Sequence, residues 1–133
     1  MAHSYLEYRG DGFFANDIDI HVLVGLLISS AKRGNMALRT GIVNAWNESL
    51  SQSGSGAIDL ELDDLIGDDI STLRQICAII AAAKEYLAAF GGSLTSDQLN
   101  VLAQARVQFV GARKAMDYAA LLDKFGSIIQ CPR

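Results

Sequence analysis

Few residues of this sequence could perform chemistry, and the first candidates are a histidine and an aspartate one helical turn apart. Asp17 and His21 are four residues apart, so a helix would place both on one face. They supply two metal ligands, whereas a catalytic zinc site needs three protein ligands, commonly in an HExxH pattern that this sequence lacks. We therefore expect no metal site, and we expect His21 to pack at a helix edge with Asp17 as its hydrogen-bond partner.

The strongest charge anomaly is a group of acidic residues between Ala57 and Asp69. A calcium loop that started at Asp59 would place Asp64 where the EF-hand requires Gly and Ile70 where it requires Glu, so that pattern fails. Two interpretations stay open, namely a solvated loop whose last acids cap the following helix, and an acidic docking face for a basic partner. The group holds six of the fifteen acidic residues, which are Asp59, Glu61, Asp63, Asp64, Asp68 and Asp69.

Motifs for nucleotide binding or nucleophilic catalysis are incomplete. Gly54 and Gly56 precede an extended segment, whereas a phosphate-binding loop follows a strand and opens a helix. Ser93 in "GGSLT" lacks the final Gly of a nucleophile elbow. Cys77 falls on an apolar helical stripe with no His one turn away, which predicts a buried and inert thiol. We therefore predict no catalytic residue, no enzyme activity and no cofactor.

The bulk composition bounds the class of protein. A chain of 133 residues, half of them apolar, is expected to form a single helical domain over residues 1–133. A net charge of -4 argues against a nucleic-acid partner, because phosphate contacts need clustered Lys and Arg. The run from Val22 to Ile28 is shorter than the ~20 residues of a membrane span, so no membrane partner is expected. No secretory signal is visible, and two cysteines make no disulfide framework, so the expected location is the cytoplasm.

Apolar residues that recur every three or four positions predict helices along most of the chain. Asp17 is expected to cap the first helix, and Thr95 with Gln98 is expected to form a capping box for the last. That last helix either runs in one piece or bends near Gly111. The predicted helices run from Asp17 to about Arg33 with a stop at Gly34, from about Met36 to Leu50, from Asp69 or Ser71 to Phe90, and from Thr95 to Phe125.

The segment between the second and third predicted helices has another pattern. "SQSGSG" from Ser51 to Gly56 predicts a polar loop, and "AIDLEL" alternates apolar and acidic residues with the period of a half-buried strand. No second strand is in view to pair with it, so we expect it to be extended. The predicted fold is all-α, a bundle of four to five helices with a short irregular or extended acidic segment, in which the Asp69–Phe90 helix is central because it is apolar on two faces.

Two arginines fall on or beside the apolar row of the last predicted helix. Arg106 and Arg113 are seven residues apart, in step with Leu99 and Ala120. They either extend their charged ends to solvent along the apolar surface or reach the acidic segment and fix it to the bundle.

The stretch "YRGDGFFAND", from Tyr8 to Asp17, contains an Arg-Gly-Asp triplet. We interpret it as a turn that lets the aromatic N-terminal segment fold over the bundle and bury its rings, because an adhesive role would require an extracellular loop. Followed by an apolar helix, this stretch resembles the opening of small bacterial toxin-immunity proteins. The resemblance covers about the first thirty residues and implies a cytoplasmic protein that blocks a cognate toxin. It transfers no functional residue.

The leading functional hypothesis is a non-enzymatic protein-binding module, with an immunity or antitoxin role as its most concrete form. Its partner is a protein, such as a basic toxin, that docks on the acidic residues. One alternative is a structural or regulatory homodimer, suggested by helices that are apolar on more than one side. A second alternative is a helical enzyme or ligand carrier that uses Asp17, His21 and the acidic segment.

Overall fold

The structure is a computed structural model, and it describes residues 3–33, 37–51 and 58–131. Within these residues the chain forms six helices and two antiparallel two-stranded sheets, so the all-α prediction is wrong and the fold mixes helices with strands. The helices are α1 (Asp17–Lys32), α2 (Ala37–Ser51), α3 (Leu62–Ile66), α4 (Ile70–Ala88), α5 (Ser96–Leu102) and α6 (Ala115–Ile128). The strands are β1 (His3–Tyr8), β2 (Asp11–Asn16), β3 (Ser93–Leu94) and β4 (Arg113–Lys114).

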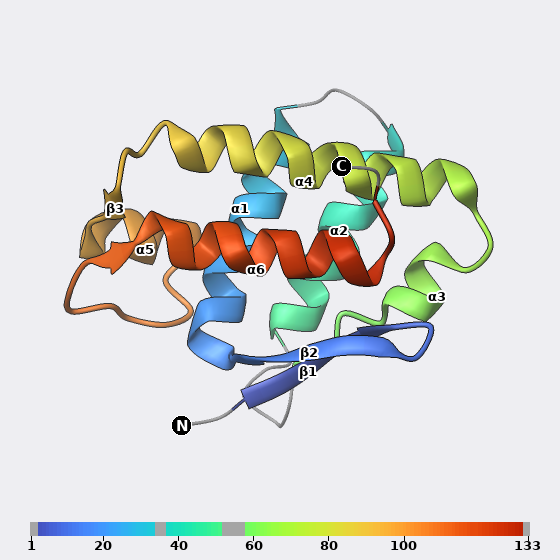
Figure 1. The fold of residues 1–133 in the computed structure, drawn as a ribbon, viewed down its shortest axis with the longest axis horizontal. Helices are drawn as coiled ribbons and strands as arrows, with labels where there is room; N and C mark the ends of the chain where they lie inside the picture. Colours follow the sequence, from blue (N-terminus) through green and yellow to red (C-terminus); the bar gives the residue numbers. More distant parts are fainter. Residues whose placement is uncertain (1–2, 34–36, 52–57, 132–133) are drawn as a thin grey trace.

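The long helices form two layers (Figure 1). Helices α4 and α6 lie side by side in one layer and cross α1 and α2, which form the layer behind them. The β1–β2 hairpin runs along one edge of both layers, α3 lies near the tip of the hairpin, and α5 lies at the opposite end of the molecule. The hydrophobic core fills the space between these elements and includes the fully buried rings of Trp46, Tyr118 and Phe125.

The N-terminal segment forms a hairpin that no helical pattern predicts. Side chains of β1 alternate between the core and the solvent, with Leu6 and Tyr8 buried. The two-residue turn Arg9-Gly10 joins the strands, and both residues have positive φ, 51° and 86°, as a type I′ turn requires. The turn interpretation of Arg-Gly-Asp is therefore confirmed.

Burial of the N-terminal rings is confirmed only in part. The ring of Tyr8 is buried, but Tyr5 and Phe14 are 41% and 70% exposed. They oppose each other across the hairpin on its outer face, with ring centroids 4.7 Å apart. A strand exposes every second side chain, so an aromatic-rich strand cannot bury all of its rings against one core.

Helix α1 is the most enclosed helix of the described structure. All of its residues from Ile20 to Ile28 are buried, so this helix is covered on most sides. Its N-cap is Asn16, one residue before the expected Asp17, and the Asn16 side chain accepts a hydrogen bond from the backbone N–H of Ile18 at 2.9 Å. The expected stop at Gly34 and start at Met36 lie outside the described residues.

Helix α4 follows its predicted bounds closely but is not the central helix. Its buried residues, including Ile76, Ile80, Ala83 and Leu87, follow one face, whereas Ala81 and Ala82 on the other face are exposed. The prediction that α4 is central is wrong because small residues such as alanine read as apolar in the sequence without being enclosed.

The acidic middle segment is irregular and then helical. Ile58, Leu60 and Leu62 are buried, as the alternating pattern predicts, but Ile58 to Leu60 form no strand and Leu62 begins α3. The backbone N–H of Ile58 donates instead to the hydroxyl of Ser4 at 2.9 Å. Residues 52–57, which include most of the predicted "SQSGSG" loop, lie outside the described residues.

The predicted last helix is two helices. The capping box of Thr95 and Gln98 is confirmed and starts α5, but Gln104 and Ala105 both have positive φ, 56° and 59°, and turn the chain out of the helical direction. Asn100 then holds the returning chain, because its Oδ1 accepts from the backbone N–H of Phe109 at 2.6 Å. A helix running to Phe125 in one piece, or with only a bend near Gly111, is therefore wrong.

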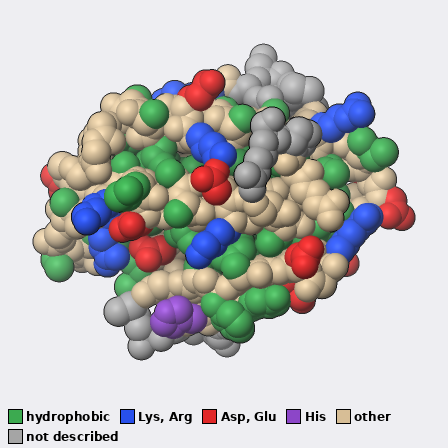
Figure 2. Space-filling model, in the orientation of Figure 1, with side chains coloured by type: hydrophobic (Ala, Val, Ile, Leu, Met, Phe, Trp, Pro, Cys, Tyr) green, Lys and Arg blue, Asp and Glu red, His purple; other side chains and the backbone are tan. Residues whose placement is uncertain are grey.

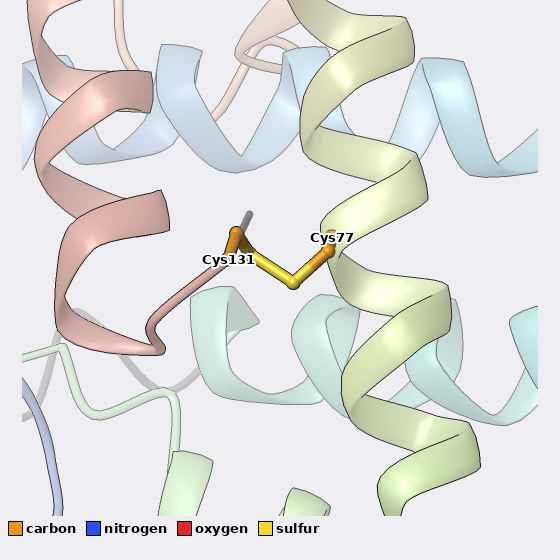
Figure 3. The surroundings of a disulfide bond; sticks show 2 residues. All are labelled: Cys77 and Cys131. Atoms are coloured by element: carbon orange, nitrogen blue, oxygen red, sulfur yellow. A yellow bond between two sulfur atoms is a disulfide. The ribbon is translucent and has the colours of Figure 1, made fainter. Parts of the chain in front are cut away.

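The two cysteines are joined. Cys77 of α4 and Cys131, in the turn after α6, form a disulfide that links α4 to the end of α6 (Figure 3). The expectation of a buried, inert Cys77 thiol is wrong. No local pattern reveals the bond, because the two residues are 54 positions apart and meet only once α4 and α6 are packed side by side.

Candidate functional site

The six predicted site residues gather around α3. The structure places all of them on the surface, in the irregular segment before α3, in α3 itself and in the connection to α4. Figure 2 shows acidic and basic side chains interspersed at the end of the molecule where α3 and the hairpin tip lie. The predicted residues therefore fall into two groups, those with a partner within the chain and those without one.

Two of the acids serve local backbone structure. The Asp69 carboxylate accepts hydrogen bonds from the backbone N–H of Ser71 at 2.9 Å and from the Thr72 hydroxyl at 3.0 Å, so Asp69 is the N-cap of α4. The Asp59 carboxylate accepts from the backbone N–H of Glu61 at 2.8 Å. The interpretation that the last acids cap the following helix is thus confirmed for Asp69.

Two more of the acids hold the hairpin tip, and their partner is Arg9. The backbone N–H of Arg9 donates to the Asp63 carboxylate at 2.9 Å, and its guanidinium donates to the Gly67 carbonyl at 3.0 Å and to Asp68 at 2.9 Å. The arginine of the Arg-Gly-Asp triplet is therefore engaged within the chain. An arginine does fix the acidic segment, but it is Arg9 and not Arg106 or Arg113.

Arg106 and Arg113 lie elsewhere. Arg113 in β4 pairs with Asp19 of α1 at 3.7 Å, and its guanidinium lies 5.3 Å from the Phe109 ring centroid. Arg106 is exposed in the loop after α5. The hypothesis that they reach the acidic segment is wrong, because the chain turns away after α5 and the two arginines do not share a helix.

The remaining two acids, Glu61 and Asp64, line a groove between α2 and α3 together with Glu48 of α2. Its volume is about 360 Å³, and its other walls are Ala45, Ser49, Leu60 and Leu65. Within the described part of the chain, none of these three carboxylates forms an ion pair or accepts a hydrogen bond. The groove therefore concentrates negative charge over a partly apolar floor.

Sequence reasoning missed Glu48 as part of this site. It lies 13 residues before Glu61 on the polar face of its own helix, and no local spacing connects the two. Only the packing of α2 beside α3 brings them to one groove. When a polar helical residue lies near a charged segment only in the folded structure, a single sequence contains no pattern that indicates their proximity.

Asp17 and His21, which are one helical turn apart, do not pair with each other. His21 is buried, 3% exposed, and its Nδ1 finds no hydrogen-bond partner among the described residues. Asp17 accepts instead from the hydroxyl of Ser4 at 2.6 Å, so the predicted Asp17–His21 hydrogen bond is wrong. Burial lowers the pKa of His21, and the positive charge of Arg106 lowers it further, while Asp17 opposes both.

Two other kinds of site are absent from the described residues. No three His, Cys, Asp or Glu side chains there are arranged to hold a metal ion. Among the helices described, none has the length and apolar character needed to cross a membrane.

Comparison of the chain with protein-family models, with curated proteins and with solved structures found no match.

Proposed function

We propose that this protein is a non-catalytic binding module and that the groove lined by Glu48, Glu61 and Asp64 receives a basic segment of a protein partner. The observation that carries the proposal is the difference within the acidic group. Asp59, Asp63, Asp68 and Asp69 hold the chain's own structure, whereas Glu61 and Asp64 line a groove and form no ion pair with the described residues.

The chemistry of the groove fits a lysine or arginine side chain. Three carboxylates around one groove repel one another, and a bound cation would relieve that repulsion and gain charge-assisted hydrogen bonds. The walls contributed by Ala45, Leu60 and Leu65 suit the apolar stem of such a side chain. Complementary charge would also raise the association rate and select against acidic partners.

An immunity or antitoxin protein is the most concrete form of this proposal. The resemblance of the N-terminal stretch to bacterial toxin-immunity proteins supports it, and so does an acidic surface that can cover a basic site of a toxin. A cytoplasmic location belongs to the same proposal. In that location cytosolic reductants would favour the two free thiols over the Cys77–Cys131 bond.

The test is to purify the tagged protein from its source cell, with and without reversed charges in the groove, and to identify the proteins that co-purify with it. The tagged Glu61→Lys/Asp64→Lys variant is compared with wild type and with Glu85→Lys/Asp97→Lys, a matched control of equal charge change at exposed sites outside the groove. We expect wild type and control to retain a basic protein near one to one and the groove variant to retain at least about tenfold less. Equal retention by all three proteins, or no stoichiometric partner for wild type, would reject the proposal.

A homodimer is the second candidate, and one observation favours it. Tyr5 and Phe14 form an exposed aromatic pair on the outer face of the hairpin. The argument from helices that are apolar on more than one side is weaker, because the apolar faces of α1 are buried within the chain itself. Light scattering at tens of micromolar checks this candidate, and a strict monomer would remove it.

A further inference from the structure

The disulfide joins α4 to the turn after α6 (Figure 3). A second groove opens beside it, between α4 and α6. This groove has a volume of about 410 Å³, and Cys77 and Cys131 both belong to its walls, with Lys84, Asp123 and Ser127 among the other lining residues. Both cysteines are partly exposed. A thiol in solution can therefore approach either sulfur from the groove without the chain first unfolding.

We propose that Cys77–Cys131 is a reversible redox site, opened by a dithiol and closed again by a small disulfide, and that opening releases only the turn after α6. This inference goes beyond the proposed binding function and does not depend on it. In the opening step one thiolate of the dithiol attacks one sulfur, and the other cysteine leaves as a thiolate that takes up a proton.

The second thiol of the dithiol then displaces the protein from the mixed disulfide. The protein gains two thiols, and the dithiol becomes a cyclic disulfide. Closure runs in the opposite sense, since the two protein thiols reduce a small disulfide such as oxidised glutathione to two thiols and are themselves joined.

Helix α6 has attachments that do not involve the disulfide. The hydroxyl of Tyr118 donates to the Asp19 carboxylate of α1 at 2.9 Å, and Leu122 and Phe125 are fully buried. Lys84 of α4 forms an ion pair with Asp123 of α6. Helix α6 therefore stays packed on α1 and α4 when the covalent bond is broken.

The turn that carries Cys131 is held more weakly. The backbone N–H of Cys131 donates to the Gly126 carbonyl at 2.8 Å, and that of Gln130 donates to the Ser127 carbonyl at 3.1 Å. Together these bonds form a Schellman motif, in which glycine is preferred at the position occupied by Gln130. Gln130 has φ 60°, which is unfavourable for a residue with a side chain. Loss of the disulfide leaves this turn to these two backbone bonds, to a longer one from the Ile129 N–H to the Phe125 carbonyl at 3.4 Å, and to the buried side chain of Ile129.

The experiment uses the full oxidised chain and dithiothreitol in native buffer. Thiols are counted by alkylation and mass spectrometry, secondary structure is followed by circular dichroism, and local opening is followed by amide hydrogen exchange. We expect two alkylated thiols, an unchanged helical spectrum, and exchange at residues 129–131 that is at least about tenfold faster, with less than about twofold change in the body of α6. Addition of oxidised glutathione should restore the slow exchange.

Two results would overturn the proposal. If dithiothreitol reduces the disulfide only after denaturant is added, the bond is inaccessible in the folded chain and serves structure alone. If the chain loses its helical spectrum on reduction, the fold depends on the bond. Cys131→Ser is the matched control. It should exchange rapidly at residues 129–131 both with and without dithiothreitol, and an effect of the reductant on this variant would show that the disulfide is not the site of action.

Discussion

Ser4 is a buried polar side chain that joins three distant parts of the chain. It is 1% exposed, its hydroxyl donates to the Asp17 carboxylate at 2.6 Å, and it accepts from the backbone N–H of Ile58 at 2.9 Å. The hairpin, the first turn of α1 and the acidic segment thus meet at one hydroxyl. Because the hydroxyl makes both hydrogen bonds at a buried position, removing it leaves buried polar groups without a partner, and we expect substitution of Ser4 to destabilise the fold.

Ser4→Ala should lower the free energy of unfolding by about 1 to 3 kcal/mol, because it leaves a buried N–H without its acceptor. Urea unfolding monitored by circular dichroism measures the change. Ser30→Ala is the matched control, since Ser30 is also buried but its hydroxyl donates only to the Leu26 carbonyl one turn earlier. We expect the control to stay within about 0.5 kcal/mol of wild type. Equal losses in the two variants would contradict the assigned role of Ser4.

His21 makes the stability depend on pH at the acidic side of neutrality. Burial first, and then Arg106, lowers the pKa of His21 in the folded chain below its ordinary value of 6.5. The unfolded chain therefore binds a proton at a higher pH than the folded chain does. The contribution to stability is complete above pH 6.5 and is lost as the pH falls from there toward the folded pKa.

We expect the melting temperature of wild type to fall between about pH 6.5 and pH 5 and that of His21→Leu to fall less over the same range. Thermal unfolding across this range measures both slopes. The carboxylates are the same in the two proteins, so their contribution cancels in the comparison. Identical slopes would mean that His21 has the same pKa in the folded and unfolded chain.

At the scale of elements, the crossing of α1 and α5 depends on one glycine. A Cβ built on Gly25 would lie 1.8 Å from the Leu102 carbonyl oxygen, so the backbone of α5 touches α1 at this point. Gly126 of α6 is the opposite case, since its Cβ would meet only the side chains of Cys131 and Ile80 at 3.9 and 4.0 Å. The two glycines look alike in the sequence and differ only in what packs against them.

Gly25→Ala should destabilise the fold by about 3 kcal/mol or more, because the clash is with backbone that has to shift. Gly126→Ala should stabilise it by about 0.5 to 1 kcal/mol, because alanine is the better helix former. Denaturant unfolding of the two variants measures the contrast. A Gly25→Ala protein as stable as wild type would show that α5 does not approach α1 so closely.

The elements that the sequence predicted well are those with a local cause. Helix α1 follows from a continuous apolar stripe, the start of α4 from the cap at Asp69, and the start of α5 from the Thr95 capping box. The hairpin was missed because its alternation is short and its turn uses Arg9 at a position where Asn or Gly is usual. The break after α5 was missed because Gln104 and Ala105 adopt the left-handed conformation, which a sequence usually indicates by Gly or Asn.

The candidate site was predicted in part for the same reason. The acidic residues lie close together in the sequence and could be recognised there. Which of them hold the chain's own structure and which line the groove depends on partners far away in the sequence. Arg9 reaches Asp68 across 59 positions, and Glu48 joins Glu61 only through helix packing. Patterns in a single sequence indicate local spacing and cannot indicate contacts between residues that are far apart in the chain.

At the scale of the whole molecule, we expect the disulfide to add stability without being needed for the fold. Closing a loop of 54 residues in the unfolded chain corresponds to about 4 kcal/mol in the chain-entropy model. A chain of 133 residues typically has about 7 to 20 kcal/mol in total, at roughly 0.05 to 0.15 kcal/mol per residue. The reduced chain should therefore remain folded, supported by the core between α1, α4 and α6.

Reduction should accordingly lower the free energy of unfolding by about 3 to 4 kcal/mol while leaving a single cooperative transition. Urea unfolding of the oxidised chain and of the chain in dithiothreitol measures the difference. A Cys77→Ser/Cys131→Ser variant should match the reduced chain and ignore the reductant. A difference below about 1 kcal/mol would mean that the bond constrains little of the unfolded chain.

The proposed preference of a basic segment for the groove between α2 and α3 is tested most directly by nuclear magnetic resonance with a short arginine-rich peptide at physiological salt. We predict that the peptide shifts the amide signals of residues 45–49 and 60–65 of wild type and leaves those of Glu61→Lys/Asp64→Lys unmoved. Shifts centred on other acids, such as Asp97 or Asp117, or shifts that survive in the variant, would contradict the assignment of this groove as the binding surface.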